Sequence, residues 1–282
     1  MPERKPETPK TEFVSLRRNV GIFNGRGGTI GWLSSAEALA IVDTQFPNTA
    51  QICLDGLPAR DGRMIDVVIN THHHGDHTSG NPVFRPVAKK LVAQENVPAL
   101  MRGRAIQDKK PVEDLVIAET TFADTWKMEL GDEVVSARYF GPAHTKGDIA
   151  VLFEKANVVH VGDLLFNRIY PVIDRPGGAS IAGWIQRLET IQKEYPADAL
   201  YVGGHGNPKF GVVAKRGELA VFRDYLSALL DYTQKAIDAG RSKAEIVTLE
   251  NFPGFADFHL PLPNRLSGNL SVAYDELTAA KG

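Results

Sequence analysis

The sequence of 282 residues predicts a single α/β domain. Short apolar runs rich in β-branched residues, such as residues 64–70, are typical of buried strands. Stretches with helical spacing, such as residues 181–194, alternate with them. Polar side chains and glycines follow the ends of several of these runs, where α/β proteins usually build their active sites. We therefore expect a sheet whose strand ends carry one functional site.

The domain is expected to occupy residues 13–282, after a charged and proline-rich segment at residues 1–12 that predicts a disordered tail. Within the domain, alternation and β-branched composition predict strands, whereas apolar residues three and four apart predict helices. Strands are predicted in residues 13–33 (two), 38–43, 64–70, 83–92 (two), 122–139 (antiparallel), 149–153, 158–166 and 199–202. Helices are predicted at residues 48–57, 96–107, 181–194, 213–239, 243–249 and 268–280.

Residues 71–77 hold four histidines and one aspartate, directly after the predicted strand at residues 64–70. Imidazole and carboxylate groups are ligands that divalent zinc accepts. Residues two apart in an extended chain point the same way, so His72 and His74 can share one metal ion while His73 points away. A solvent-exposed histidine-rich loop that binds metal adventitiously is the alternative interpretation.

Further residues of the ligand type follow the same layout elsewhere in the chain. Asp76 and His77 come after the turn at Gly75 and can face a second metal ion. Three more positions are flanked by glycine or proline next to apolar strands, and these are His144, Asp163 and His205. Any one of them alone could be structural, but the recurrence of one layout at successive strand ends indicates a metal site.

The pattern H-x-H-x-D-H, followed by a later histidine, aspartate and histidine, resembles the signature of the metallo-β-lactamase superfamily. The resemblance runs from about Val20 to about His205. It implies a four-layer αββα sandwich of two mixed β-sheets, here with a C-terminal helical extension. It also implies that a loop at residues 25–29 covers the metal site. The ligand sets it implies are His72, His74 and His144 for the first metal, Asp76, His77 and His205 for the second, and Asp163 as the bridge.

The residue at the bridging position bears on the reaction. Many zinc β-lactamases have a cysteine there, whereas Asp163 resembles the glyoxalase II-like and other general hydrolases of the superfamily. The resemblance therefore implies a dinuclear zinc hydrolase that uses a metal-activated hydroxide on an ester, thioester, lactone or β-lactam. Asp76 is expected to steer the nucleophile or carry its proton, in addition to binding metal. Iron or manganese would suit the same ligands as zinc.

Two other functions remain open at this point. The same fold with iron carries out oxidoreductase chemistry such as sulfur dioxygenation, although the sequence contains no flavin or sulfur-carrier domain. A metal-stabilised binding module without catalysis is the other alternative, which the complete ligand set argues against. The identity of the bound metal distinguishes the iron-dependent oxidoreductase from the zinc hydrolase. Normal metal content without turnover would favour the binding module.

The segment that follows Asp163 is expected to line the substrate pocket. The candidate pocket residues are Phe166, Asn167, Arg168 and Tyr170. Arg168 or Arg175 is a candidate for binding a substrate carboxylate, because the guanidinium group matches that shape. A solvated surface arginine is the alternative for both.

Composition excludes several classes of protein. The formal net charge of −2 gives no electrostatic case for nucleic acid, and no apolar run reaches the length of a membrane span. The only cysteine, Cys53, excludes an internal disulfide and is expected in the core. The expected partner is a small-molecule substrate, with the oligomeric state open. Without a signal-peptide core the chain is expected to be cytoplasmic, but a periplasmic or secreted protein whose export signal was removed would look the same.

Overall fold

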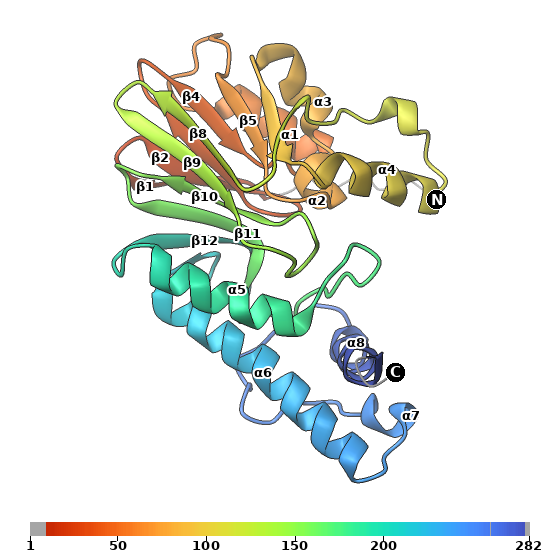
Figure 1. Ribbon diagram of the computed structural model, residues 1–282. Coiled ribbons are helices and arrows are strands. Elements are labelled where there is room, and N and C mark those ends of the chain that lie inside the picture. Colours follow the sequence, from red (N-terminus) through yellow and green to blue (C-terminus); the bar gives the residue numbers. More distant parts are fainter. Residues whose placement is uncertain (1–9, 260, 280–282) are drawn as a thin grey trace, which may run out of the picture.

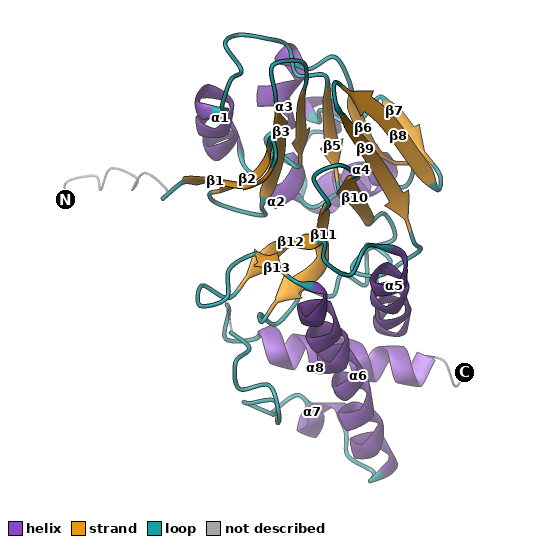
Figure 2. Ribbon diagram, turned by 90° about the vertical axis from the view of Figure 1, so that its left-hand side faces the viewer, coloured by secondary structure: helices purple, strands orange, loops and turns teal. Residues whose placement is uncertain are grey.

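The computed structural model describes residues 10–259 and 261–279. Two mixed β-sheets pack face to face, with helices on both outer faces (Figures 1 and 2). Most of the predicted tail, residues 1–9, lies outside the described residues. The first strand already begins at Glu12, one residue before the expected start of the domain.

The first sheet has seven strands in sequence order, β1 to β7. Its first four strands pair antiparallel, and β4 to β7 pair parallel. Parallel pairing brings the carboxyl ends of β4 and β5 to the same edge, where the histidine-rich motif begins. The strands are β1 Glu12–Arg17, β2 Val20–Asn24, β3 Ile30–Ser34, β4 Leu39–Val42, β5 Val67–Asn70, β6 Leu91–Gln94 and β7 Thr120–Phe122.

The second sheet has six strands in the order β13-β12-β11-β10-β9-β8. All neighbours pair antiparallel except β11 and β12, which are parallel. The predicted antiparallel region and the two later strands are therefore confirmed. The strands are β8 Thr125–Leu130, β9 Glu133–Tyr139, β10 Ile149–Phe153, β11 Val158–Asn167, β12 Leu200–Gly206 and β13 Val213–Ala214.

Three hydrophobic clusters correspond to the three interfaces of a four-layer sandwich. Alternation along β4 divides its side chains, because successive residues of a strand face opposite sides. Ala40 and Val42 face the second sheet, whereas Leu39 and Ile41 face the helices on the outer side. A third cluster lies between the second sheet and its covering helices. The predicted αββα sandwich is confirmed.

Helices α1 to α4 accompany the first sheet, and α5 and α6 cover the second (Figure 1). Ser180 caps the N-terminus of α5, because its side chain accepts from the Gly183 backbone amide. No helix within the described ranges is long and apolar enough to span a membrane. The helices are α1 Pro47–Gly56, α2 Gly75–Thr78, α3 Asn81–Phe84, α4 Val97–Gln107, α5 Ile181–Glu194, α6 Arg216–Asp238, α7 Lys243–Ile246 and α8 Arg265–Ala279, with short 3-10 helices at Arg85–Val87 and Val112–Asp114.

Three element predictions differ from the structure. Residues 83–92 are not a strand pair, because α3 and a 3-10 helix precede β6. Pro82 and Pro86 occupy early positions of these two turns, where the missing amide hydrogen costs nothing. The predicted helix at residues 213–239 starts later, because Val213 and Ala214 pair with β12 as an edge strand. Residues 13–33 also form three strands instead of two.

Candidate metal centre

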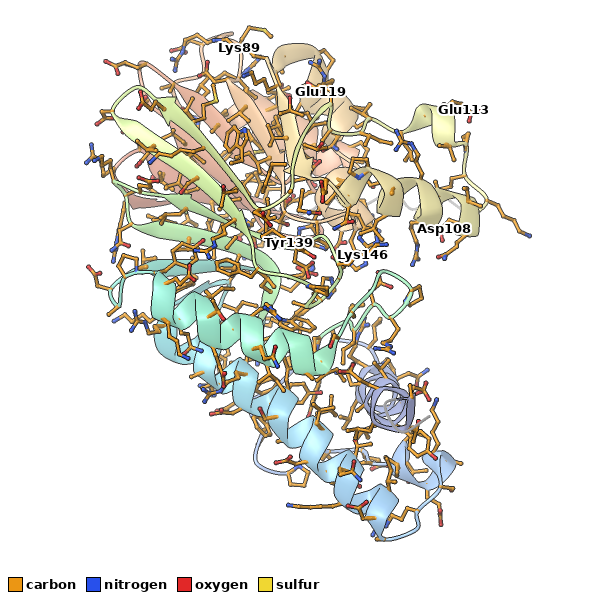
Figure 3. All side chains as sticks on the ribbon, viewed as in Figure 1. Lys89, Asp108, Glu113, Glu119, Tyr139 and Lys146 are labelled. Carbon is orange, nitrogen blue, oxygen red and sulfur yellow. The ribbon has the colours of Figure 1, made fainter. Side chains whose placement is uncertain are left out.

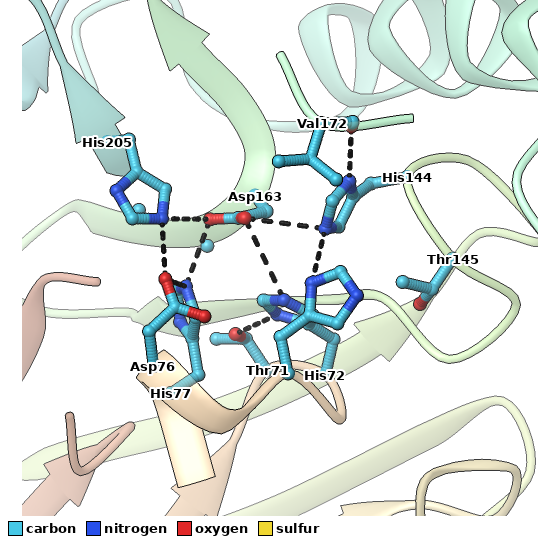
Figure 4. A network of polar contacts seen from close by, with 12 residues as sticks. Thr71, His72, Asp76, His77, His144, Thr145, Asp163, Val172 and His205 are labelled. Carbon is cyan, nitrogen blue, oxygen red and sulfur yellow. Dashed lines mark hydrogen bonds and ion pairs between the residues drawn. The ribbon is translucent and has the colours of Figure 1, made fainter. Parts of the chain in front are cut away.

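All seven predicted ligand residues converge at one edge of the sandwich (Figure 4). Residues 71–77 leave the end of β5 and enter the short helix α2. His144 lies in the turn before β10, and Asp163 and His205 lie on the parallel neighbours β11 and β12. Segments that are far apart in sequence thus deliver their side chains to a single place.

The carboxylate of Asp163 lies between two groups of ligand-type residues. We call His72, His74 and His144 the inner group, and Asp76, His77 and His205 the outer group. Asp163 Oδ2 lies 3.3 Å from His144 Nε2 and 3.8 Å from His72 Nε2. Asp163 Oδ1 lies 3.1 Å from His77 Nε2 and 3.6 Å from His205 Nε2. Each oxygen therefore faces a different group, as a bridging ligand requires.

The outward-facing ring nitrogens of the inner group are held by hydrogen-bond acceptors. His144 Nδ1 lies 2.9 Å from the Val172 carbonyl oxygen, and His74 Nε2 lies 2.9 Å from Asp174 Oδ2. Because neither acceptor can donate, both of these nitrogens carry the proton. In the neutral rings the atoms without a proton are then His144 Nε2 and His74 Nδ1, which face each other at 3.0 Å.

Asp43 orients the His77 ring directly and the His72 ring through the Thr71 hydroxyl. His77 Nδ1 lies 2.7 Å from Asp43 Oδ2. The Thr71 hydroxyl donates to Asp43 Oδ2 at 2.7 Å and lies 3.1 Å from His72 Nδ1, which therefore donates to it. The inward nitrogen of His72 is buried without a hydrogen-bond partner among the described residues, and that of His77 is buried 3.1 Å from Asp163 Oδ1.

Unprotonated nitrogens that face one another and a carboxylate repel unless a cation lies among them. Donor atoms about 2.0–2.1 Å from a tetrahedral zinc ion are roughly 3.3 Å apart, which is close to the separations found here. The donors are imidazole nitrogens and carboxylate oxygens, which suit zinc and also iron or manganese. The residues therefore fit one divalent ion in each group.

The pKa values of the ligand-type residues also indicate a place for positive charge at this site. Burial lowers the pKa of His144 to about 3 and that of His72 well below its usual value, so both rings stay neutral. Burial favours the neutral form of Asp163, but the neighbouring His205 and His77 hold its pKa well below the usual range. Burial likewise opposes protonation of His77, yet Asp163 and Asp43 raise its pKa well above normal. A positive charge beside Asp163 is thus favoured.

Glycines allow the chain to approach the outer group closely. A Cβ atom at Gly28 would lie 2.2 Å from the His77 ring, and one at Gly204 would lie 2.0 Å from Asp163 Oδ1. The Gly28 amide donates to the Asp76 carbonyl oxygen at 3.0 Å. The hairpin loop at residues 25–29 therefore lies against the outer group, where the sequence predicted a covering loop.

Two carboxylates at the site were missed by the sequence analysis. Asp43 directly follows β4, so the strand-end layout that identified the other ligands pointed to it as well. Asp174 lies 100 residues from His74 in a loop without regular structure, and no local pattern marks it. Both residues position ligand-type histidines, a role that supporting carboxylates commonly have in metal sites.

A cavity of about 1130 Å³ opens onto His74, Asp76 and His205. Phe166 and Tyr170, two of the candidate pocket residues, line this cavity.

The structure corrects the pocket prediction for Asn167 and Arg168, which do not line this cavity. Asn167 is buried and donates to the Gly211 carbonyl oxygen. Arg168 points to another surface, where Glu218 lies 2.8 Å from its Nε atom. Arg175 is paired as well, with Glu276 at 3.3 Å. Both arginines named for carboxylate binding are therefore already engaged within the protein.

Comparison with known proteins identifies related chains. The model of the metallo-beta-lactamase superfamily matches residues 24–207. A metallo-beta-lactamase type 2 from Elizabethkingia meningoseptica is 24% identical over 72% of this chain and 82% of its own. A hydroxyacylglutathione hydrolase from Methylococcus capsulatus is 28% identical over 65% of each chain.

Solved structures show the same fold over more of the chain. A metallo-beta-lactamase from Pontibacter korlensis superposes with a TM-score of 0.63 and 18% identity, covering 77% of this chain and 99% of that one. A sec-alkylsulfatase from Pseudomonas sp. superposes with a TM-score of 0.74 and 15% identity, covering 94% of this chain and 50% of that one. Together, the ligand motif, the sandwich and the family match show that the chain belongs to the metallo-beta-lactamase superfamily.

Proposed function

We propose that the protein is a hydrolase with two divalent ions, zinc in the first instance, that acts on an ester, thioester, lactone or β-lactam. The observation that carries this proposal is the division of the Asp163 oxygens between two groups of inward-facing ring nitrogens. Relatives described as a metallo-beta-lactamase and a hydroxyacylglutathione hydrolase support hydrolysis as the reaction.

In this proposal the inner group holds one ion, the outer group holds the other, and Asp163 bridges them. When bound, such ions lower the pKa of water toward neutrality and polarise a carbonyl oxygen. Asp174 and Asp43 keep the ring nitrogens of His74 and His77 in the required tautomers.

Asp76 has the position for a second role in the reaction. Its side chain is 30% exposed and lines the cavity, with Oδ2 3.0 Å from His205 Nε2. Burial would raise its pKa, but His77 and His205 lower it to about 2, so the carboxylate is ionised at neutral pH. It therefore serves better as a hydrogen-bond acceptor that orients an attacking water than as a strong base.

Phe166 supports the same side of the site. Its ring stacks on that of His205, with ring centroids 5.4 Å apart and an angle of 21° between the planes. Phe166 is also buried, so it fixes the His205 ring and excludes water from that wall of the cavity.

The first test is the metal content of the purified protein. We expect two zinc ions per chain in the wild type and a clear loss in Asp163→Ala. Asp257→Ala, which removes an exposed carboxylate paired with Arg168, is the matched control and should keep the wild-type content. A protein that binds no metal even after reconstitution would overturn the proposal.

Activity distinguishes the competing functions. A panel of a chromogenic ester, a thioester, a lactone, a cephalosporin and a secondary alkyl sulfate tests hydrolysis directly. Iron as the native metal would redirect the proposal to oxidoreductase chemistry. Full metal content without turnover of any substrate on the panel would instead favour a metal-stabilised binding module.

A further inference from the structure

The charged side chains of the cavity differ in how far they are already neutralised. Arg104 and Lys110 both approach Asp108, at 3.1 Å and 3.7 Å. Asp108 follows the last residue of α4 (Figure 3) and also lines the cavity. These two cations therefore share one carboxylate from the protein.

Arg265, the first residue of α8, lines the same cavity and has no such carboxylate among the described residues. Arg26 also lines the cavity, but it is exposed and lies over the Phe46 ring. The Arg265 side chain makes no ion pair or hydrogen bond with any residue that the structure describes, and its Nε atom is buried. Burial lowers the pKa of Arg265, yet a guanidinium stays charged in proteins. A partly buried cation without a partner is costly, and an anion in the cavity would remove that cost.

Much of the cavity lining is apolar. The apolar or largely apolar residues in it include Met101, Leu115, Val116, Ile169, Tyr170 and Leu262. An apolar surrounding strengthens the attraction between a guanidinium and an anion, because less water screens it. The cavity volume of about 1130 Å³ accommodates a small organic molecule, and its lining includes both Arg265 and three of the ligand-type residues.

We propose that Arg265 binds a carboxylate at the far end of the substrate, so that the preferred substrate is an acyl compound with an apolar body and a remote carboxylate. This inference rests on the proposed function for the position of the acyl carbon beside His74, Asp76 and His205. The planar guanidinium matches a carboxylate in two parallel hydrogen bonds. Arg265 lies beyond residues 24–207, so the C-terminal extension supplies this specificity.

The kinetic test compares two esters that differ only in their remote group. The probes are 4-nitrophenyl hydrogen adipate, which has a free carboxylate, and 4-nitrophenyl methyl adipate, which is neutral. We expect the wild type to prefer the acid by about 10- to 100-fold in kcat/KM, the range for a hydrogen bond to a charged group. Arg265→Gln should reduce this ratio to near one, and Arg265→Lys should restore part of it.

The ratio is the readout because a folding defect lowers both rates together. Arg104→Gln is the matched control, since it removes a cavity arginine that already has a partner, and it should keep most of the preference. A wild type without preference for the acid, or an Arg265→Gln variant that keeps it, would overturn the inference while leaving the proposed hydrolysis intact.

A binding measurement tests the inference even if neither ester is hydrolysed. Calorimetry on the metal-loaded protein compares 4-phenylbutyrate with 4-phenylbutyramide. We expect the wild type to bind the acid about 10-fold or more tightly than the amide, and Arg265→Gln to lose that difference. Equal affinities in the wild type, or a preference that survives in the variant because the acid binds the metal ions, would contradict the inference.

Discussion

The inner and outer groups contain similar residues in different surroundings. The side chains of His72 and His144 are 1% and 0% exposed, whereas those of Asp76 and His205 are 30% and 25% exposed. In the inner group each histidine has its outward nitrogen held by a neighbour. His74 of the inner group is 15% exposed and His77 of the outer group is 0% exposed, so the contrast is one of degree. The comparison teaches that Asp163 lies between a group that is mostly buried and a group in which two of the three side chains reach the cavity.

The largest expected effect comes from Asp43, which serves both groups through His77 and Thr71. Asp43 is fully buried and has a backbone φ of 63°, in the left-handed region that few non-glycine residues adopt. Asp43→Asn keeps the size but removes the acceptor of His77 Nδ1. We expect the free energy of unfolding to fall by about 3–5 kcal/mol, as when one partner of a buried pair is lost.

Chemical denaturation of the metal-loaded protein measures this change, and metal analysis should show weakened binding of both ions. Asp132→Asn, at an exposed carboxylate paired with Arg18, is the control. If only the outer ion were lost, the coupling of Asp43 to His72 through Thr71 would be negligible.

Asp174 allows the inner group to be perturbed alone. Its Oδ2 atom accepts from His74 Nε2, and no described contact joins it to the outer group. Asp174→Asn should weaken the ion of the inner group by about 10- to 100-fold, the usual effect of removing a supporting partner. Competition with a fluorescent zinc chelator measures the two affinities separately. Asp114→Asn, at another carboxylate that lines the cavity, should leave both affinities unchanged.

Exposure predicts the order in which the ions leave. Because Asp76 and His205 border the cavity, the ion of the outer group should exchange first during stepwise dialysis against a chelator. The intermediate with one ion should then match His205→Ala protein in its metal content and in the absorption spectrum after cobalt substitution. Loss of both ions in one step would show that the two groups bind cooperatively.

The last expected effect is one of pH dependence, and it concerns the turn that carries His144. Asp148 is buried and accepts from the Thr145 amide and hydroxyl, both at 2.7 Å. Burial raises the pKa of Asp148 to about 7, although the bonds from Thr145 oppose this.

In the unfolded chain Asp148 loses its proton near pH 4, whereas in the folded protein it keeps the proton up to about pH 7. The contribution of Asp148 to the free energy of unfolding therefore falls as pH rises from about 4 to 7. Thermal melts of the wild type and Asp148→Asn across this range provide the test. The stability advantage of the wild type should shrink up to about pH 7 and stay constant above it. An unchanged difference between the two proteins would mean that Asp148 is already ionised near pH 4.

The sequence by itself indicated most of the strands and the ligand-type residues beside them, and the αββα sandwich followed from the resemblance of that motif to the metallo-β-lactamase superfamily. Strand periodicity is local, and the seven ligand-type residues stand beside strands that can be recognised one at a time. Asp43 was within reach of the same reasoning, because it also follows a buried strand.

Only the tertiary structure decided which charged residues form ion pairs within the protein and which remain able to bind a ligand. Arg168 and Glu218 are 50 residues apart, Arg175 and Glu276 are 101 apart, and Asp174 is 100 residues from His74. Sequence pattern shows that an arginine is present but not which carboxylate lies beside it. Arg265 therefore became a candidate only when the fold brought the start of α8 to the cavity, because an ion pair depends on distance in space and not along the chain.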